Sequence, residues 1–415
     1  MSEAGSAATL DAIRVVVALV SVAALAALVV ARLRIPYSVT LVVLGLIAGA
    51  LLPRGTIQVT PELVLLVLVP GLVFEAALRL DLEHLRPTFG WIVLLAAPGV
   101  LISALIVAVV LQLATGLRFE LGLVVGSMVA ATDPVAVIAT FRRLRVPPRL
   151  ATLVEGESLA NDGTALVLFS ATVAAIAGST SVAEIAQDIV VSVVSSVGIG
   201  LVAGWLASRL LAFVDDRPIE LTISIAAAYG TYLLADGLEQ SGIIATVVAG
   251  LVIGSYGRRH GLSPRALDTL DVVWELIAFL LTAFAFLLVG LAISPSDLVA
   301  DAGTILWGLV AVLVARAVAV YGLVGGLAAL MGERAHWPKP PIGWLHVLFW
   351  AGLRGAVAIA MALSLPEDFP QRALLQQITF GVVLFTLFVQ GTTAGLVVGR
   401  TGARGEAAAG AGQRA

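Results

Sequence analysis

The chain has 415 residues, of which 60% are apolar and 12% charged, and its mean hydropathy is +1.06. These values exclude an ordinary soluble domain, and the net charge of -3, with no basic run, gives no sign of nucleic-acid binding. Without cysteine there are no disulfides or thiolate metal sites, and the four histidines lack metal-ligand spacing, so we expect no cofactor.

Apolar stretches of about 20 residues, the length that spans a bilayer as a helix, recur along the chain. The alternating pattern of a membrane β-barrel is absent. We therefore predict an all-α polytopic membrane protein with about 13 transmembrane helices. The predicted spans are residues 12–31, 36–52, 61–78, 90–114, 120–141, 148–177, 183–213, 218–236, 241–256, 270–292, 301–331, 342–363 and 372–399.

Basic residues indicate the orientation of these spans. Eighteen of the 24 arginines and lysines fall in alternate connections or in the tail, and the opposite connections hold only Arg54, Arg118 and Arg372. Because cytoplasmic loops carry the excess of basic residues, we expect the N-terminus outside and the C-terminus in the cytoplasm. The first apolar stretch lacks a cleavage site and is predicted to be a span, and residues 401–415 a short disordered tail.

Several charges remain at membrane depth, where each costs a few kcal/mol or more unless it is paired, solvated or neutralised. A single such residue can be explained by a buried ion pair or by a position at the membrane interface, but several together favour an ion pathway. They are Glu75, Asp133, Glu155, Glu157, Asp162 and Arg354, with Asp236, Glu275 and Arg316 of less certain depth.

The fifth span carries Thr132-Asp133-Pro134 at its middle. Proline removes a backbone donor and clashes with the preceding turn, so this helix should be interrupted there. Interrupted helices at membrane depth are tolerated where they line a cavity, and an aspartate at the break is well placed to bind a cation.

In the sixth span, Glu155, Ser158 and Asp162 share one helix face, while Glu157 and Asn161 lie on a neighbouring face. Ser158 and Asp162, with Asp133 from the adjacent span, offer the oxygen ligands that hard cations prefer. The glycine-rich twelfth span carries Arg354, the obvious partner for Glu157, and is expected to be interrupted as well. Two interrupted spans in corresponding halves predict an inverted-repeat transporter.

Four segments together resemble the NhaP-type monovalent cation/proton antiporters over nearly the whole chain: ATDPVAV, GESLANDG, GLRGAVAIA and FVQGTT, in this order. The resemblance also includes Phe74-Glu75 in the third span. It implies a Na⁺ (or Li⁺)/H⁺ exchanger, a secondary transporter rather than an enzyme, in the plasma membrane and usually homodimeric.

The resemblance also implies roles for single residues. Asp162, Asp133 and Ser158 would bind Na⁺, with Thr132 lining the site and Glu75 helping through water. Glu157 and Arg354 would form a buried ion pair, and Asn161 would hold the crossed helices. Asparagine at 161, where electrogenic relatives carry an aspartate, implies electroneutral one-for-one exchange.

For such a fold we expect a dimerisation scaffold of residues 1–89 and 214–300. A transport core of residues 90–178 and 301–400 would rock against it in alternating access, with residues 179–213 as a linking span. Alternatives to Na⁺/H⁺ exchange are K⁺/H⁺ exchange, a cation channel or sensor, and an intramembrane aspartyl protease using Asp133 and Asp162. The protease signatures are absent, and oxygen ligands do not separate Na⁺ from K⁺.

Overall fold

The computed structural model describes residues 36–51, 60–178, 182–262, 264–331 and 339–401, together with residues 17, 20–28 and 30. The first predicted span, 12–31, is described only in part, and the tail beyond residue 401 lies outside the described residues. All regular secondary structure in the described residues is helical, and these residues contain no strand. The predicted all-α class is confirmed.

The helices of the first half follow the predicted spans closely. The helix at the fourth span begins before the predicted residue 90: it runs without interruption over Leu82–Thr115 and includes a π-helical stretch that contains Pro98. The elements are α2 (Tyr37–Leu51), a π-helical segment (Leu63–Leu68) continuing as α3 (Val69–Arg79), α4 (Leu82–Leu94), α5 (Val100–Thr115), α6 (Phe119–Ala130), α7 (Val135–Leu144), α8 (Pro148–Ala177) and α9 (Val182–Leu211).

Local sequence signals set several helix ends in the second half as well. Asp216 and Ser241 cap the first turns of α10 and α11, through the amides of Ile219 and Ile244. The elements are α10 (Arg217–Gly237), α11 (Gly242–Val252), α12 (Arg258–His260), α13 (Pro264–Ala292), α14 (Pro295–Ala300), α15 (Ala302–Ala317), α16 (Gly326–Met331), α17 (Ile342–Trp350), α18 (Ala356–Leu363), α19 (Arg372–Phe385) and α20 (Thr392–Arg400).

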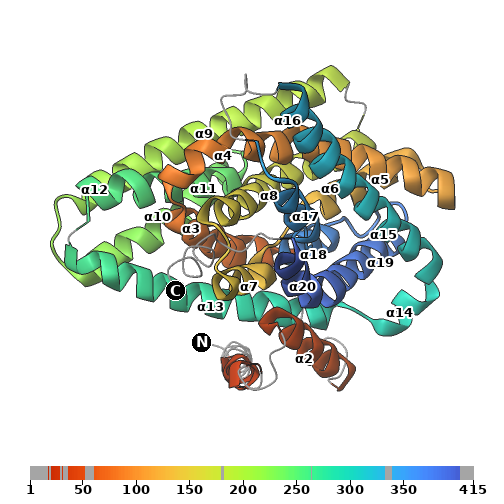
Figure 1. The fold of residues 1–415 in the computed structure, drawn as a ribbon, viewed down its shortest axis with the longest axis horizontal. Helices are drawn as coiled ribbons and strands as arrows, with labels where there is room; N and C mark the ends of the chain where they lie inside the picture. Colours follow the sequence, from red (N-terminus) through yellow and green to blue (C-terminus); the bar gives the residue numbers. More distant parts are fainter. Residues whose placement is uncertain are drawn as a thin grey trace, which may run out of the picture.

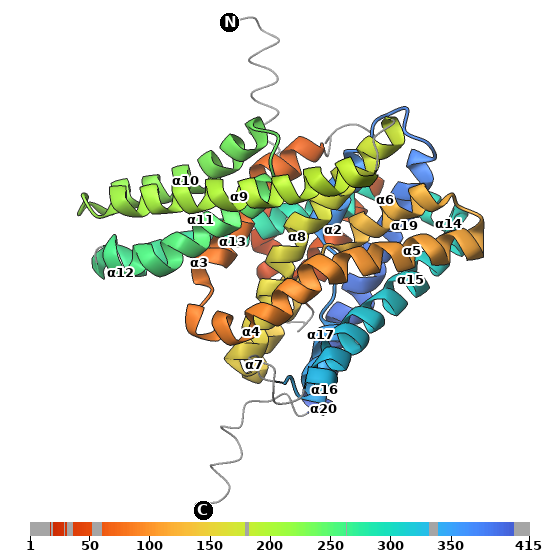
Figure 2. The same ribbon diagram turned by 90° about the horizontal axis from the view of Figure 1, so that it is seen from above.

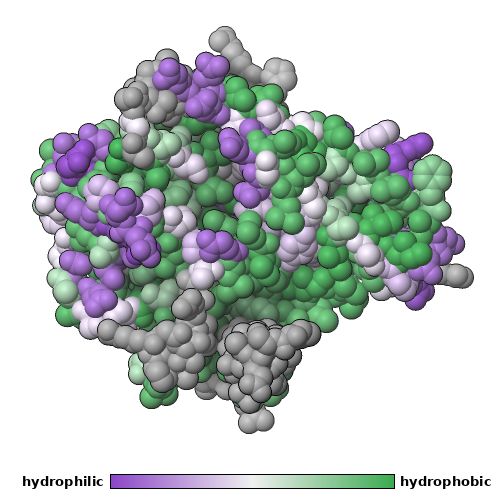
Figure 3. All heavy atoms as spheres, turned by 180° about the vertical axis from the view of Figure 1, so that it is seen from behind, coloured by the Kyte–Doolittle hydropathy of each residue, from purple (hydrophilic) through white to green (hydrophobic). Residues whose placement is uncertain are grey.

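Seven of the described helices are long and apolar enough to cross a membrane, and the shorter α2 and α6 are apolar too. Figure 3 shows broad hydrophobic areas on one face, with hydrophilic residues gathered on its left side, at its top and at its right tip and in smaller patches near the centre. The molecule is a multi-pass membrane protein. The count of 13 spans stays a prediction. The seven long helices are Leu82–Thr115, Pro148–Ile176, Gln187–Leu211, Arg217–Gly237, Leu267–Ala292, Ala302–Leu330 and Arg372–Arg400.

Helix α8 lies near the centre of the bundle in both ribbon views (Figures 1 and 2). Helices α3 and α10–α12 gather on one side of it, and α5, α6 and α14–α20 on the other. Small residues allow the closest helix contacts: a Cβ on Gly45 of α2 would lie 2.9 Å from the Cα of Gly290 of α13. A side chain at either position would push these two helices apart.

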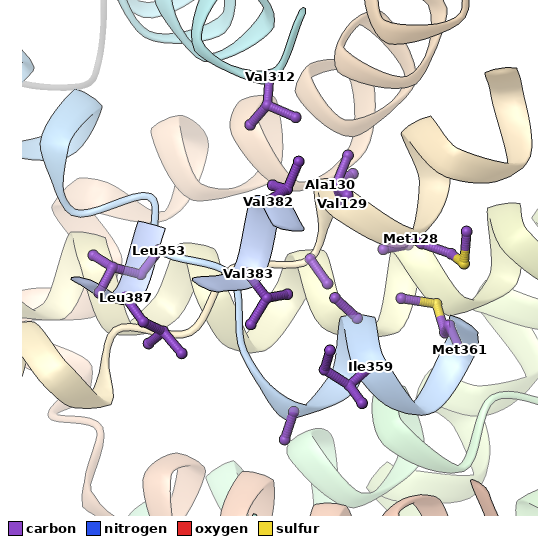
Figure 4. Packing of buried hydrophobic residues seen from close by; sticks show 14 of the residues in the cluster. Met128, Val129, Ala130, Val312, Leu353, Ile359, Met361, Val382, Val383 and Leu387 are labelled. Atoms are coloured by element: carbon purple, nitrogen blue, oxygen red, sulfur yellow. The ribbon is translucent and has the colours of Figure 1, made fainter. Parts of the chain in front are cut away.

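The buried apolar core on one side of α8 is shared by α6, α15, α18 and α19 (Figure 4). Met128 of α6 and Met361 of α18 belong to this core, together with Ile359 of α18 and Val383 of α19. All four side chains are fully buried or nearly so. This packing holds the two interrupted spans against each other and so positions the residues at their breaks.

Candidate ion-binding site

Both predicted interruptions are present, and they meet. Helix α6 ends at Ala130 and α7 begins at Val135, while α17 ends at Trp350 and α18 begins at Ala356. The backbone amide of Asp133 in the first break donates a 2.8 Å hydrogen bond to the carbonyl of Leu353 in the second. This bond satisfies polar backbone groups that the breaks leave without helical partners.

The sequence explains why the chain is interrupted at these points. Pro134 has no amide hydrogen and its ring disfavours a continuous helix through residues 130–133. In the second break, a Cβ on Gly355 would lie 2.1 Å from Oδ2 of Asp133, and a Cβ on Gly352 would lie 2.7 Å from Nε of Arg316. Only glycine lets the second break lie this close to the aspartate and the arginine.

Asn161 and Ser158 of α8 bind the first break on its other side. The side-chain oxygen of Asn161 accepts a 3.1 Å hydrogen bond from the amide of Thr132, and its Nδ2 donates to Oγ1 of the same threonine over 2.7 Å. The hydroxyl of Ser158 donates to the carbonyl of Thr132. All three residues are buried. The amide of Asn161 is therefore engaged in holding the break.

A cavity of about 820 Å³ opens beside the crossing. It brings together all five residues predicted to bind the ion. They are Glu75, Thr132, Asp133, Ser158 and Asp162. Asp162 is 9% exposed, and Asp133 also accepts a 3.0 Å hydrogen bond from the amide of Val135. Two carboxylates and neighbouring hydroxyl and carbonyl oxygens at one cavity wall form the donor set that a hard cation requires.

Glu75 lines this cavity but is engaged by a neighbour one helical turn away. Its Oε1 lies 2.6 Å from Nε of Arg79, with the two side chains 16% and 25% exposed. Nη2 of Arg79 donates a 3.0 Å hydrogen bond to the carbonyl of Asp271 in α13 and lies 3.6 Å from the carboxylate of Glu275. Arg79 lies one residue beyond the predicted third span, 61–78, and is the last residue of α3.

The expected ion pair between Glu157 and Arg354 is wrong in its basic partner. Glu157 pairs with Arg316 of α15: Nη1 of Arg316 contacts Oε1, and Nη2 donates to Oε2 over 2.9 Å. Nη2 also donates to the carbonyl of Leu348 in α17 over 2.7 Å. The side chains of Arg316 and Glu157 are 8% and 3% exposed. A guanidinium matches both carboxylate oxygens in this geometry, and Oε1 of Glu157 also accepts a 3.4 Å hydrogen bond from Nδ2 of Asn161.

Arg354 is 3% exposed and lies near Glu157 and Asp162 without an ion pair to any described residue. Its backbone amide donates a 3.0 Å hydrogen bond to Oγ1 of Thr386 instead of to a helical carbonyl, and its Nη1 donates to the carbonyl of Gly352 over 3.1 Å. Its Nε has no partner within the described part of the chain. Arg316 thus occupies the acidic partner expected for Arg354, and Arg354, although close to Asp162, is not among the residues that line the ion cavity.

Sequence reasoning singled out Arg316, Glu155 and Glu275 as charges at depth but gave them no role. Glu155 and Glu275 line the cavity, whereas Asp236 of α10 is exposed and lies away from it. The spacing of Glu75 and Arg79, four residues apart on one helix, could have indicated their ion pair. No comparable signal joins Glu157 to Arg316, which are 159 residues apart in the chain.

An all-helical membrane bundle with two aspartates in a cavity, at the crossing of two interrupted helices, defines an ion transporter. Residues 17–399 match the family model described as "Sodium/hydrogen exchanger, transmembrane". The chain belongs to the sodium/hydrogen exchanger family. It is thus a member of a family of transporters.

Individual relatives agree. The chain is 39% identical over 379 residues to the Na⁺/H⁺ antiporter ApNhaP of Aphanothece halophytica, which covers 90% of this chain and 71% of that protein. It is 38% identical to the low-affinity Na⁺/H⁺ antiporter NhaS1 of Synechocystis, covering 91% and 72%. The solved structure of the sodium proton antiporter MjNhaP1 from Methanocaldococcus jannaschii matches with a TM-score of 0.77 at 20% identity, covering 94% of this chain and 98% of that one. This last match concerns the fold.

Proposed function

We propose that this protein exchanges Na⁺ or Li⁺ for H⁺ across the membrane. The observation that carries the proposal is the position of Asp133 and Asp162 in one cavity at the crossing of the two interrupted helices. The names of the similar antiporters point the same way. Na⁺ would bind Asp133, Ser158 and Asp162, with Thr132 lining the site and Glu75 assisting through water.

Exchange follows if Na⁺ and protons compete for the same carboxylates. An empty site with two buried anions is costly to move through the membrane interior, whereas a site neutralised by a proton or a cation is less so. Conformational change with a loaded site is therefore favoured over change with an empty one. That condition couples the two ions and suppresses leak.

We further propose that the exchange is electroneutral and proceeds by alternating access. The engaged amide of Asn161, which bridges Thr132 in place of a second titrating acid, supports a one-for-one stoichiometry. The moving unit would be the transport core of residues 90–178 and 301–400, and the scaffold of residues 1–89 and 214–300 would form a homodimer. The basic loops would lie on the cytoplasmic side of the plasma membrane.

The test is ion-driven recovery of a ΔpH probe in proteoliposomes, compared for Li⁺, Na⁺ and K⁺. Wild type should respond to Na⁺ and Li⁺, whereas a response to K⁺ alone would favour the K⁺/H⁺ alternative. Asp162→Asn and Asp133→Asn should each reduce exchange to background while the protein stays folded. The matched control is Asp236→Asn, the same chemical change at an exposed residue away from the cavity. Normal exchange in either cavity variant would refute the site.

A further inference from the structure

A second cavity, of about 620 Å³, lies next to the ion-binding cavity. Its lining includes the last residue of α3, the segment that follows it, and the charged residues of α12 and α13 near Arg258. Four residues line both cavities and therefore form the neck between them. All four are charged: Arg79 of α3, Arg142 of α7, Glu155 of α8 and Glu275 of α13.

Glu75 lies on the inner side of this neck. It lines only the inner cavity, together with Asp162, whereas Arg79, one turn further along α3, lines both. Glu75 and Arg79 are 2.6 Å apart. The carboxylate of Glu75, which lines the ion cavity, is thus paired with the guanidinium of Arg79 beside the neck through which a transported cation would enter.

The guanidinium of Arg79 is held from two further directions. Its Nη2 bonds the carbonyl of Asp271 and lies 3.6 Å from Glu275, whose side chain is 64% exposed. Asp271 itself is occupied by Arg258, which binds both of its carboxylate oxygens. Glu275 can therefore form an ion pair with Arg79 when the ion pair between Arg79 and Glu75 breaks.

We propose that Arg79 is a positioning residue that competes with the transported cation for Glu75 and so sets the apparent ion affinity of the site. This inference rests on the proposed function. With Arg79 on Glu75, the negative charge of the cavity is partly neutralised and cations bind Asp162 more weakly. When Arg79 moves toward Glu275, Glu75 becomes free to support the ion. An arginine that merely stabilised the end of α3 would have no effect on ion affinity.

The test is the apparent KM for Na⁺ in proteoliposomes at a fixed alkaline pH. Arg79→Gln frees Glu75 and should lower KM about three- to fivefold, the scale of a partly exposed ion pair. In a Glu75→Gln background the same substitution should leave KM within about 1.5-fold, because no carboxylate remains to be released. The control is Arg258→Gln, which removes an equal charge from the outer cavity without contacting Glu75 and should leave KM near that of wild type.

Three results would overturn the inference. One is an unchanged or raised KM in a folded Arg79→Gln protein. A second is an equal fall in KM when Arg79→Gln is introduced with and without Glu75. The third is an equal fall in KM in the Arg258→Gln protein. Either of these two results would assign the effect to the overall electrostatic field of the charges that line the two cavities. Failure of wild type to exchange Na⁺ for protons would instead refute the proposed function, so the two failures are distinguishable.

Discussion

The ion pair between Glu157 and Arg316 joins α8 to α15 at the back of the ion site, and its removal tests how the core is held together. Arg316→Met keeps an unbranched apolar stem in place of the arginine stem but deletes the guanidinium and its charge. The change leaves the carboxylate of Glu157 buried and deprives it of both close contacts to the guanidinium. What remains is a 3.4 Å hydrogen bond from Nδ2 of Asn161.

The expected loss is large, because both side chains are nearly excluded from solvent, at 8% and 3% exposure. Removing one partner of a buried pair leaves an uncompensated charge and costs roughly 3–5 kcal/mol. The bond from Arg316 to the carbonyl of Leu348 adds about 1 kcal/mol. Glu157→Gln should lose a similar amount, since it strands the guanidinium. The double variant removes both charges and should recover much of the loss.

Unfolding of the four proteins in mixed micelles, titrated with SDS, gives the free energies of this cycle. We expect a coupling energy of about 2 kcal/mol or more between Glu157 and Arg316. A parallel cycle with Arg354→Met is the control, because Arg354 is equally buried but makes no ion pair to Glu157 among the described contacts. Additive losses for Glu157 and Arg316, or a larger coupling with Arg354, would refute the pairing.

Three other outcomes are expected. Proteoliposomes given Na⁺ and a pH gradient should exchange at the same rate with and without a clamped membrane potential, and a steep voltage dependence would contradict electroneutrality. Gly355→Ala places a Cβ against Oδ2 of Asp133, so it should cost about 1–3 kcal/mol of stability and weaken transport, whereas Gly303→Ala, with open space around it, should do neither. Ser158→Ala should raise the KM for Na⁺ with little change in maximal rate, and an unchanged KM would remove Ser158 from the ligand set.

The interruptions of the fold could be predicted because their causes are local. Pro134 removes a helical hydrogen bond from an apolar span, and the glycines around Arg354 lower the helix propensity of another. The backbone contact between Asp133 and Leu353, through which the breaks meet, was not predicted from the residues; only the resemblance to the antiporter family implied that the two helices cross. The continuous helix from Leu82 to Thr115 was harder to foresee, because Pro98 is absorbed in a π-helical stretch instead of ending it.

The partners of the buried charges could not be predicted in the same way. Arg316 and Arg354 both lie in apolar spans, and sequence spacing does not say which of them reaches Glu157. The choice depends on the relative placement of α8, α15 and the second break, which is a property of the whole bundle. The pairing of Glu75 with Arg79 differs, because both lie on one helix and their spacing already brings them together.

The backbone bond between Asp133 and Leu353 has a consequence for how such a site can vary. The two breaks are held together by a hydrogen bond between main-chain atoms. A substitution nearby can therefore alter the chemistry of the site while this bond keeps the register and the spacing of the two breaks. Changing the number of residues in either break would shift that register by a full residue. Except at Gly352 and Gly355, where a Cβ would clash, substitution within 131–134 and 351–355 should therefore disturb the spacing of the walls less than insertion or deletion.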